Sequence, residues 1–578
     1  MNARVLENDE PLATYPETLG ELFWRTATAA AARPFLLERM GDTWQQLTYG
    51  EAFEQARQLA SAYASIGLSP NRPLLTLSPN SVKHALVILG AYLAGVPVAP
   101  VTSSYSTASQ DFGRLQHILD VVRPGAIYVA PFAAHGRFAE VARARKVRLI
   151  TDQRAPYEAV ELDELLRSGA PATQLPQLGP DSIAKIMFTS GSTGPPKGVI
   201  NTHRMLCANQ QMAAQLWPEL VAADTVLLDW LPWSHTFGGN KVFHLVLRAA
   251  ATLYLDNGRP TETAFGATLR NLAEVRPTAY LGVPVAFELL LKHLSEDKTL
   301  RHRFFSRLRL MLFAAASLRK PVWLELQRLA HETTGRRIPL LTGWGTTETG
   351  PVATGTLRAW ADPTGIGWPA PGVQIRLVPT GDATEIRVRG PNVTPGYYGD
   401  PASTAAAFDE LGFFRTGDIG RLDAEGRTLV LEGRMAENFK LSSGTWVDTA
   451  AIRRSLLELG NPLIREVVVT APNRDYLGAL IWLANTADLC EPGDMRNATM
   501  EIVRQHNERS TGTSHRIRRV IIVAAPLDPD AHEITEKGYV NQLRVLANRT
   551  PLIDRLYAEP VSDPVLDLND SGASSTQG

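Results

Sequence analysis

The chain has few cysteines, no dominant charge and no long apolar run. Two cysteines among 578 residues cannot form a disulfide framework, which excludes a small secreted fold held by disulfides. The 58 basic residues balance 59 acidic ones and no basic run stands out, so nucleic acid is not expected as a partner. The longest apolar stretch, residues 85–101, is interrupted by glycines and prolines and is shorter than the roughly 20 residues of a membrane span. No membrane span is therefore expected.

The first residues carry no targeting signal. Residues 1–16 are acidic and lack the apolar core of a signal peptide, which together with the sparse cysteines predicts a cytoplasmic protein. The composition, 44% hydrophobic and 20% charged, is ordinary for a globular protein. Because the chain is too long for one hydrophobic core, we expect a large enzyme of two or more domains.

Short apolar strands alternate with longer helical stretches from Arg72 to about Pro284, and the pattern recurs to about Thr356. This alternation is typical of parallel strands joined by crossover helices. From Gly372 the pattern changes to short alternating strands separated by turn residues, which predicts a small β-rich lobe. The sequence therefore predicts an α/β fold whose large N-terminal domain, residues 1–434, contains parallel-sheet subdomains and this lobe.

A smaller, mobile α+β domain is expected over residues 435–560, where helical and strand patterns are mixed. The segment 561–578 has no basic or aromatic residue and is rich in Ser, Gly and Asp. This composition predicts a disordered tail.

A loop rich in glycine and hydroxyl residues follows an apolar strand at residues 187–203, MFTSGSTGPPKGVINTH. Backbone amides of such a loop, together with the Lys197 ammonium, suit a polyphosphate. The loop is not of the kinase type, which requires lysine directly after glycine, because Lys197 follows Pro196. Composition alone leaves a mobile surface turn as the alternative.

The stretch TSGSTGPPKG is similar to the signature of AMP-forming adenylating enzymes, which include acyl- and aryl-CoA synthetases, carrier-protein-loading domains and luciferases. Further motifs of the family follow in the expected order, FAAASL, GWGTTETG, FFRTGD and GRMAENFKLSSG, and the resemblance extends over roughly residues 17–560. Three other stretches, APVTSSYSTASQDFGRLQHI, LDWLPWSHTFGGN and FKLSSGTWV, resemble bacterial feruloyl-CoA synthases, a branch that acts on hydroxycinnamates.

The resemblance implies a ligase reaction in two displacements. The carboxylate attacks the α-phosphorus of ATP and releases pyrophosphate, and the CoA thiolate then expels AMP from the acyl-adenylate. ATP, CoA and Mg²⁺ are the implied cofactors, and a hydroxycinnamic acid such as ferulate is the implied substrate. The oligomeric state is left open, with a homodimer as one option.

On this resemblance the glycine-rich loop holds the phosphates. Lys197 and the loop would contact the β- and γ-phosphates, and Thr347 would contact the α-phosphate. Glu348 would position Mg²⁺ together with the hydroxyl of Thr193. The loop positions implied are Thr189, Ser190, Gly191, Ser192, Thr193 and Gly194.

The adenosine residues implied by the resemblance come from three later motifs. Trp344 occupies a position where the family has an aromatic ring, usually tyrosine, against adenine. Asp418 would accept hydrogen bonds from the ribose hydroxyls, with Arg434 in support. The small residues of the adenine wall would be Ala315, Ala316 and Ser317.

The acid would lie between other motifs. His235, in the spacing P-x-x-H-x-x-G, matches a histidine beside the reacting carboxylate, although a lone histidine is more often structural. Pro351 and Val352 fall where aryl-CoA synthetases line the aromatic pocket. Weaker pocket candidates are Trp233, Tyr280 and Gly282.

The C-terminal motifs depart from the family pattern. Ala436 occupies a hinge position that is commonly Asp or Lys. Lys537 is the implied catalytic lysine, but it lies two residues after Thr535 and before a glycine rather than after one. Lys440 is a second catalytic candidate.

Two other functions are considered. One is a broader acyl-CoA ligase or a carrier-protein-loading enzyme, although no carrier-like Gly-Gly-Asp-Ser segment follows Pro560 and free CoA is the preferred acceptor. The other is a catalytically dead nucleotide-binding regulator, which the intact Lys197, Glu348, Asp418 and Arg434 argue against. A luciferase-like oxygenase would share every motif.

Overall fold

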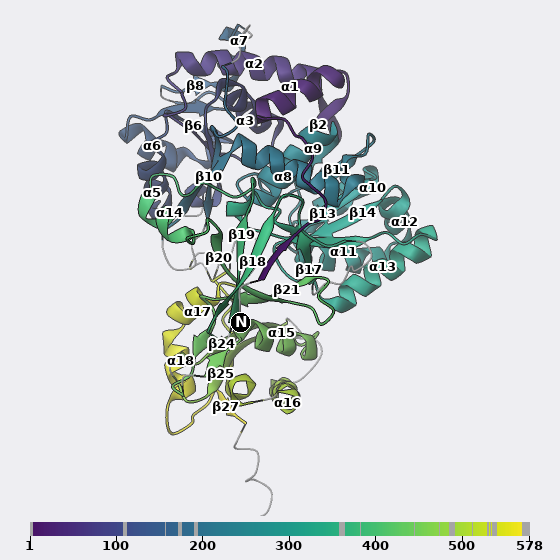
Figure 1. The fold of residues 1–578 in the computed structure, drawn as a ribbon, viewed down its shortest axis with the longest axis vertical. Helices are drawn as coiled ribbons and strands as arrows, with labels where there is room; N and C mark the ends of the chain where they lie inside the picture. Colours follow the sequence, from purple (N-terminus) through teal and green to yellow (C-terminus); the bar gives the residue numbers. More distant parts are fainter. Residues whose placement is uncertain are drawn as a thin grey trace, which may run out of the picture.

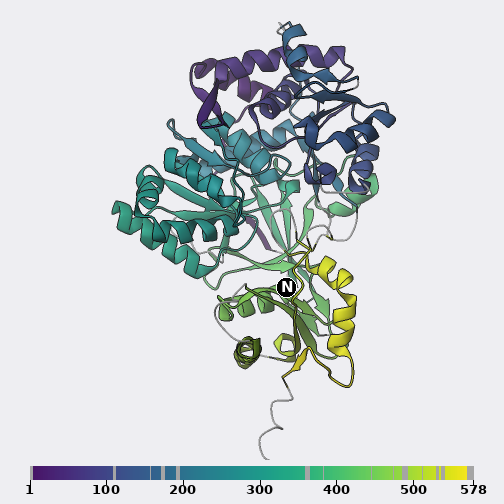
Figure 2. The same cartoon turned by 180° about the vertical axis from the view of Figure 1, so that it is seen from behind.

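The structure is a computed structural model. It describes residues 4–107, 112–156, 158–170, 176–189, 195–357, 365–381, 383–443, 445–472, 474–484, 492–510, 512–528, 531, 533–534 and 540–568. Figures 1 and 2 show a large N-terminal part and a smaller C-terminal domain that lies at one end of the molecule, below β20 and β21. No helix in these ranges is both long and apolar enough to cross a membrane.

A seven-stranded sheet forms the N-terminal end of the large domain. Its strands are parallel except for β10, and their spatial order is β10 (Lys197–Thr202), β9 (Ile183–Thr189), β5 (Val98–Val101), β4 (Leu74–Leu77), β6 (Ala126–Val129), β7 (Arg148–Thr151) and β8 (Val160–Glu161). The helices α2 (Tyr49–Ser65) and α3 (Val82–Ala94) pack on one face, and α5 (Gly113–Val122) and α6 (Gly136–Ala144) on the other. The strands β4, β5 and β6 are fully buried and, apart from Thr76, apolar, because both faces of the sheet are covered.

The second sheet has ten strands and carries most of the motifs. Its order is β1 (Arg4–Glu7), β18 (Gln374–Thr380), β19 (Ala383–Arg389), β20 (Phe414–Leu422), β21 (Leu429–Arg434), β17 (Gly365–Pro369), β16 (Thr354–Gly355), β15 (Leu340–Trp344), β14 (Leu310–Phe313) and β13 (Ala279–Gly282). Only β13, β14 and β15 pair in parallel. The β-rich part predicted after Gly372 is confirmed as antiparallel strands, and β17, which pairs with both β16 and β21, makes it continuous with the parallel strands.

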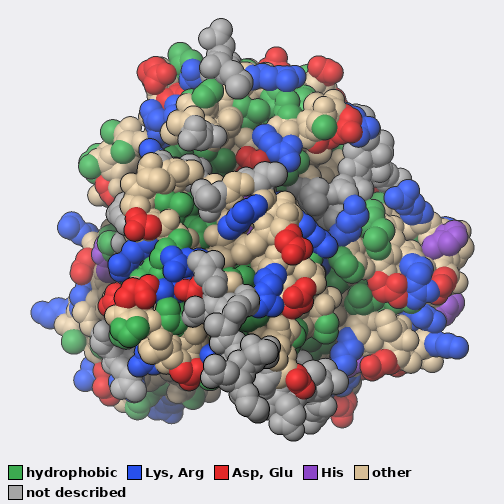
Figure 3. All heavy atoms as spheres, turned by 90° about the horizontal axis from the view of Figure 1, so that it is seen from below, with side chains coloured by type: hydrophobic (Ala, Val, Ile, Leu, Met, Phe, Trp, Pro, Cys, Tyr) green, Lys and Arg blue, Asp and Glu red, His purple; other side chains and the backbone are tan. Residues whose placement is uncertain are grey.

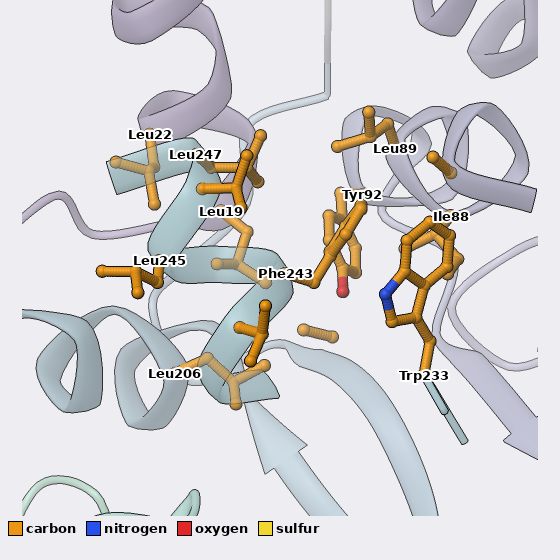
Figure 4. Packing of buried hydrophobic residues seen from close by; sticks show 14 of the residues in the cluster. Leu19, Leu22, Ile88, Leu89, Tyr92, Leu206, Trp233, Phe243, Leu245 and Leu247 are labelled. Carbon is orange, nitrogen blue, oxygen red and sulfur yellow. The ribbon is translucent and has the colours of Figure 1, made fainter. Parts of the chain in front are cut away.

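Helices and a smaller sheet complete the large domain. The four-stranded sheet has the order β11 (Val226–Asp229), β12 (Thr252–Leu255), β2 (Pro34–Met40) and β3 (Thr43–Thr48). Figure 4 shows apolar side chains from α1 (Leu19–Ala29), α3, α8 (His203–Leu216) and α9 (Phe243–Ala249) gathered in one core. A second core lies under α10 (Phe265–Glu274), α11 (Pro284–Glu296), α12 (Lys298–Ser306) and α13 (Lys320–Thr334).

The C-terminal domain is a mixed four-stranded sheet with helices, as predicted. The sheet order is β24 (Ile464–Thr470), β25 (Leu477–Leu483), β26 (Ile517–Ile522) and β27 (Val565–Asp567), and a hairpin of β22 (Phe439–Lys440) and β23 (Trp446–Val447) precedes it. Its helices are α15 (Thr449–Leu459), α16 (Pro492–Arg509), α17 (Gln542–Asn548) and α18 (Thr550–Tyr557). Figure 3 shows the face of the molecule seen from below, where basic and acidic side chains are interspersed.

The predicted disorder of residues 561–578 is wrong for the first part of that segment. β27 pairs antiparallel with β26, and the Asp567 carboxylate accepts a hydrogen bond of 2.8 Å from Nε of Arg519, whose side chain is 1% exposed. The composition did not predict this strand, because the strand is ordered by its pairing with β26 and with buried Arg519, and not by the average polarity of the segment. The rest of the predicted tail, residues 569–578, lies outside the described residues.

The Arg519–Asp567 pair predicts a strong asymmetry between two aspartates. Asp567→Ala leaves a buried guanidinium without its main partner, so we expect the free energy of local unfolding at β26 to fall by about 3–5 kcal/mol. Asp563 pairs with Arg496 at the surface, and Asp563→Ala is expected to cost less than about 1 kcal/mol. Hydrogen exchange of the β26 amides measures both values. Equal losses in the two variants would contradict the assignment.

Candidate active site

The predicted nucleotide motifs come together around one turn that follows β15. This turn, residues 345–352, is preceded by Trp344 and contains Thr347 and Glu348 in a single helical turn, Thr347–Thr349. Trp344 donates a hydrogen bond to Asp418 on β20, which in turn pairs with Arg434 on β21, and Glu348 accepts a hydrogen bond from Tyr397 in the segment after β19. The turn therefore connects two groups of polar side chains, which we call the adenosine corner (Trp344, Asp418, Arg434) and the phosphate corner (Lys197, Glu348, Tyr397).

The adenosine corner is built from strand ends. Asp418 on β20 lies opposite Arg434 on β21 in the antiparallel register. Its Oδ1 is 3.1 Å from Nε of Arg434, and its Oδ2 accepts a hydrogen bond of 2.9 Å from Nε1 of Trp344. The pKa of Asp418 is raised above its ordinary value, because the effect of burial exceeds the opposing effects of the Arg434 charge and the hydrogen bond from Trp344.

The three side chains hold one another in a fixed orientation. A carboxylate offers about four acceptor positions, so Asp418 keeps acceptor capacity for two sugar hydroxyls after bonding both neighbours. The indole bond also fixes the plane of Trp344, the ring predicted to stack on adenine. Of the predicted adenine wall after β14, Ala315 and Ser317 are exposed and Ala316 is half-buried.

The phosphate corner brings together residues from three segments. Lys197 begins β10, and its Nζ lies 5.1 Å from the centre of the Tyr397 ring. The Tyr397 hydroxyl donates a hydrogen bond of 3.1 Å to Oε1 of Glu348. Burial, followed by the Glu348 charge, raises the pKa of Tyr397. The tyrosine thus remains a neutral donor that orients the carboxylate.

Tyr397 was not predicted from the sequence, because it lies in the turn PGYYGD, which carries no catalytic signature. Of the predicted loop, Thr189 ends β9 and pairs with Lys197 across the hairpin. The other predicted loop residues lie outside the described residues: Ser190, Gly191, Ser192, Thr193 and Gly194.

Two buried asparagines hold the turn in place. The side-chain amides of Asn209, on α8, and Asn392 each donate to the carbonyl oxygens of Thr349 and Val352, at 2.8–3.1 Å. A Cβ atom at Gly345 would lie 1.6 Å from the Pro351 carbonyl oxygen, so only glycine fits at the start of the turn. Neither asparagine was predicted, because a single buried asparagine has no recognisable sequence motif around it.

His235 lies two residues before the π-helix η3, Phe237–Val242. Its ring is half-buried, and its carbonyl oxygen accepts a hydrogen bond of 2.7 Å from the Gly239 amide. A Cβ atom at Gly238 would lie 2.3 Å from the Leu231 carbonyl oxygen, which explains the glycine in the spacing P-x-x-H-x-x-G. A π-helical turn is often found at functional sites.

The weaker pocket candidates lie in different environments. Trp233 and Tyr280 are each 1% exposed and pack against other rings, Trp233 against Phe243 and Tyr280 against Phe304. The structure therefore gives both rings a role in the hydrophobic cores. Gly282 ends β13, where an added Cβ would meet only ordinary contacts.

Val352 is 7% exposed and lies beside half-buried Pro351 in the turn held by the two asparagines.

The two lysines predicted to be catalytic belong to the C-terminal part of the chain. Lys440 is exposed on β22, where its backbone pairs with Trp446. Lys537 lies outside the described residues.

The donor groups suit a magnesium ion that is carried in with a polyphosphate. The described ranges contain no group of three or more His, Cys, Asp or Glu side chains that could hold a metal by itself. Mg²⁺ commonly uses one or two protein carboxylates and completes its shell with water and phosphate oxygens. Glu348, oriented by Tyr397 beside Lys197, fits that requirement.

This fold and these two corners define an adenylate-forming enzyme. A family model described as AMP-binding enzyme matches residues 23–398, and one described as AMP-binding enzyme C-terminal domain matches residues 437–560. The chain belongs to this family of AMP-binding enzymes.

Curated relatives and solved structures agree with this assignment. A methyl-dioxo-octahydroindenyl propanoyl:CoA ligase of Rhodococcus jostii (strain RHA1) is 30% identical over 75% of this chain and 83% of its own length. A 4-coumarate–CoA ligase of Pinus taeda is 27% identical over 78% of this chain and 82% of its own length. The ATP-bound structure of MatB from Rhodopseudomonas palustris has a TM-score of 0.73 at 23% identity, with 92% and 99% of the two chains covered. This last likeness shows the fold.

The phosphate corner predicts a graded effect at Tyr397. Tyr397→Phe keeps the ring beside Lys197 but removes the hydroxyl that orients Glu348, so we expect MgATP to bind about tenfold more weakly, roughly one hydrogen bond. Tyr397→Ala also removes the ring and should weaken binding further. Isothermal titration calorimetry measures both affinities. Wild-type affinity in the Phe variant would show that the hydroxyl does not orient the site.

Proposed function

We propose that the protein is an ATP-dependent, AMP-forming acid–CoA ligase that converts a hydroxycinnamic acid such as ferulate into its CoA thioester through an acyl-adenylate. The observation that carries the proposal is the single turn, residues 345–352, that joins the adenosine and phosphate corners. A nucleoside triphosphate bound across this turn would place its α-phosphate near Thr347, between the corners.

Three residues of the corners and His235 have distinct tasks in this reaction. Asp418 accepts hydrogen bonds from the ribose, and Lys197 offsets the charge of the phosphates. Glu348 would hold Mg²⁺, which when bound neutralises phosphate charge. His235 would lie beside the acid, whose carboxylate oxygen forms a bond to the α-phosphorus while the bond to pyrophosphate breaks. The CoA thiolate then attacks the acyl carbon and AMP leaves.

Three observations favour an aromatic acid and CoA as the substrates. The stretch LDWLPWSHTFGGN around His235 resembles feruloyl-CoA synthases. The Pinus taeda relative is named a 4-coumarate–CoA ligase, a hydroxycinnamate enzyme by its name. Pro351 and Val352 lie in the turn that the asparagines hold, where a flat ring would be bounded by fixed backbone.

Turnover with a panel of acids tests the proposal. The full chain is incubated with MgATP, CoA and ferulate, 4-coumarate, cinnamate, benzoate or medium-chain fatty acids, and released AMP and thioester absorbance are measured. We expect equal amounts of AMP and thioester, with hydroxycinnamates preferred. No AMP release with any acid would exclude the ligase function, and a preference for fatty acids would exclude the substrate class.

Glu348→Gln tests the proposed metal-binding role of Glu348 in the same assay. The substitution keeps the size of the side chain and its acceptor oxygen for Tyr397 but removes the charge that would face the ion. We expect adenylate formation to fall at least about a hundredfold with folding intact, the scale for one electrostatic contact to a reacting group. A wild-type rate would remove Glu348 from the site.

Lys537→Ala separates the two half-reactions. The resemblance assigns this lysine to the first step, where an ammonium between carboxylate and α-phosphate reduces their repulsion. We expect the variant to lose ferulate-dependent ATP–pyrophosphate exchange but still convert supplied feruloyl-AMP and CoA to thioester. Equal loss of both half-reactions, or of neither, would reject the role of Lys537.

A further inference from the structure

Two buried lysines lie at the π-helix that follows His235, one within it and one beside it, and among the described residues only one of them has a hydrogen-bond partner. Lys185, on β9, donates from Nζ to the Gly239 carbonyl oxygen at 2.6 Å and to Oδ1 of Asn240 at 3.3 Å. Lys241, within the helix, is 1% exposed, and its Nζ has no hydrogen-bond acceptor among the described residues. Lys185 therefore has a structural role, whereas the ammonium of Lys241 has none that hydrogen bonding explains.

The Lys241 ammonium lies over an aromatic face. Nζ lies 5.1 Å from the centre of the Trp217 ring. A cation–π contact of this kind contributes less than an unpaired buried ammonium costs. Burial alone lowers the pKa of Lys241 to about 7, and no carboxylate contributes. A folding core would be more stable with an apolar side chain at this position.

The Trp217 ring links this ammonium to the strands of the proposed site. Cβ atoms added at Gly343 and Gly355 would lie 3.0 Å and 2.7 Å from atoms of the Trp217 ring, so the ring packs against β15 and β16. These strands flank the turn that carries Val352. Lys241 thus belongs to the helix that follows His235, and its ammonium lies at the Trp217 ring, which packs against the strands beside Val352.

We propose that Lys241 makes the enzyme selective for carboxylic acids that carry a second oxygen acceptor, a hydroxyl or a carboxylate, at the end remote from the activated carboxyl group. The inference rests on the proposed ligase function and defines its substrate class. The phenolic oxygen of a 4-hydroxycinnamate would accept a hydrogen bond from Nζ and give the ammonium the partner it lacks. An acid without such an oxygen leaves the ammonium buried and unpaired.

Matched pairs of acids test this selectivity. The specificity constants of wild type and Lys241→Met are compared for 4-coumarate against cinnamate and for heptanedioate against heptanoate. We expect wild type to prefer the acid with the second oxygen by roughly 10- to 100-fold, the range for a hydrogen bond to a charged group. Lys241→Met should bring the ratio of the two specificity constants near one. The specificity constant for the acid with the second oxygen should fall, and that for the acid without it should stay unchanged.

Lys185→Met is the matched control, because it removes a buried lysine beside the same helix. It should lower the melting temperature, since it deprives Gly239 and Asn240 of their donor, and leave the acid ratio unchanged. Lys241→Met should instead keep or raise the melting temperature, because it replaces an unpaired ammonium with an apolar side chain of similar length. A melting temperature lowered as in Lys185→Met, with an unchanged acid ratio, would assign Lys241 a purely structural role.

The outcomes separate this inference from the proposed function. Turnover of the panel with the same acid ratio in wild type and Lys241→Met would overturn the role of Lys241 and leave the ligase function standing. No turnover of any acid by wild type would overturn the ligase function instead. In that case, calorimetric binding of the four acids in the presence of AMP decides about Lys241. Equal affinity of wild type for the acids with and without the second oxygen would reject its role.

Discussion

The site depends on the hydrogen bonds that Asn209 and Asn392 make to the turn after β15. Both amides donate to the carbonyl oxygens of Thr349 and Val352, so two segments far apart in the chain fix the same four residues. Because Trp344 precedes this turn and Glu348 lies within it, the turn sets the distance between the adenosine and phosphate corners. Buried hydrogen bonds from two sides to the same carbonyl oxygens restrain the turn, and such restraint is what a reaction based on positioning requires.

The sequence predicted the features that repeat or cluster. Alternating apolar runs predicted the strands of both large sheets, and Asp418 and Arg434, predicted as a pair, lie opposite each other on β20 and β21. Tyr397, Asn209 and Asn392 were missed, since each is one polar residue whose partner lies far away in the chain. The strand at Asp567 was missed for the same reason, because its partner Arg519 is recognised only once the sheet has formed.

Two buried charges are treated differently in this fold. Arg519 is buried with carboxylate and backbone partners and serves the C-terminal domain as a structural anchor. Lys241 is equally buried but has no hydrogen-bond acceptor within the described part of the chain, an exception to the usual rule that buried charges are paired. Proteins tolerate such exceptions mainly at functional sites, where a ligand completes the interaction. The proposed role of Lys241 follows from this contrast, because Arg519 has its partners within the fold and Lys241 would obtain one from the substrate.

The central claim is that the two corners activate a carboxylic acid by joining it to AMP. Isotope transfer tests this claim most directly, because the carboxylate oxygen that attacks the α-phosphorus stays with AMP when the thiol displaces it. The enzyme is supplied with an acid labelled with ¹⁸O in its carboxyl group, together with MgATP and CoA, and the products are examined by mass spectrometry. One ¹⁸O atom in each released AMP is the result expected. Unlabelled AMP, or ¹⁸O in orthophosphate, would contradict the acyl-adenylate route.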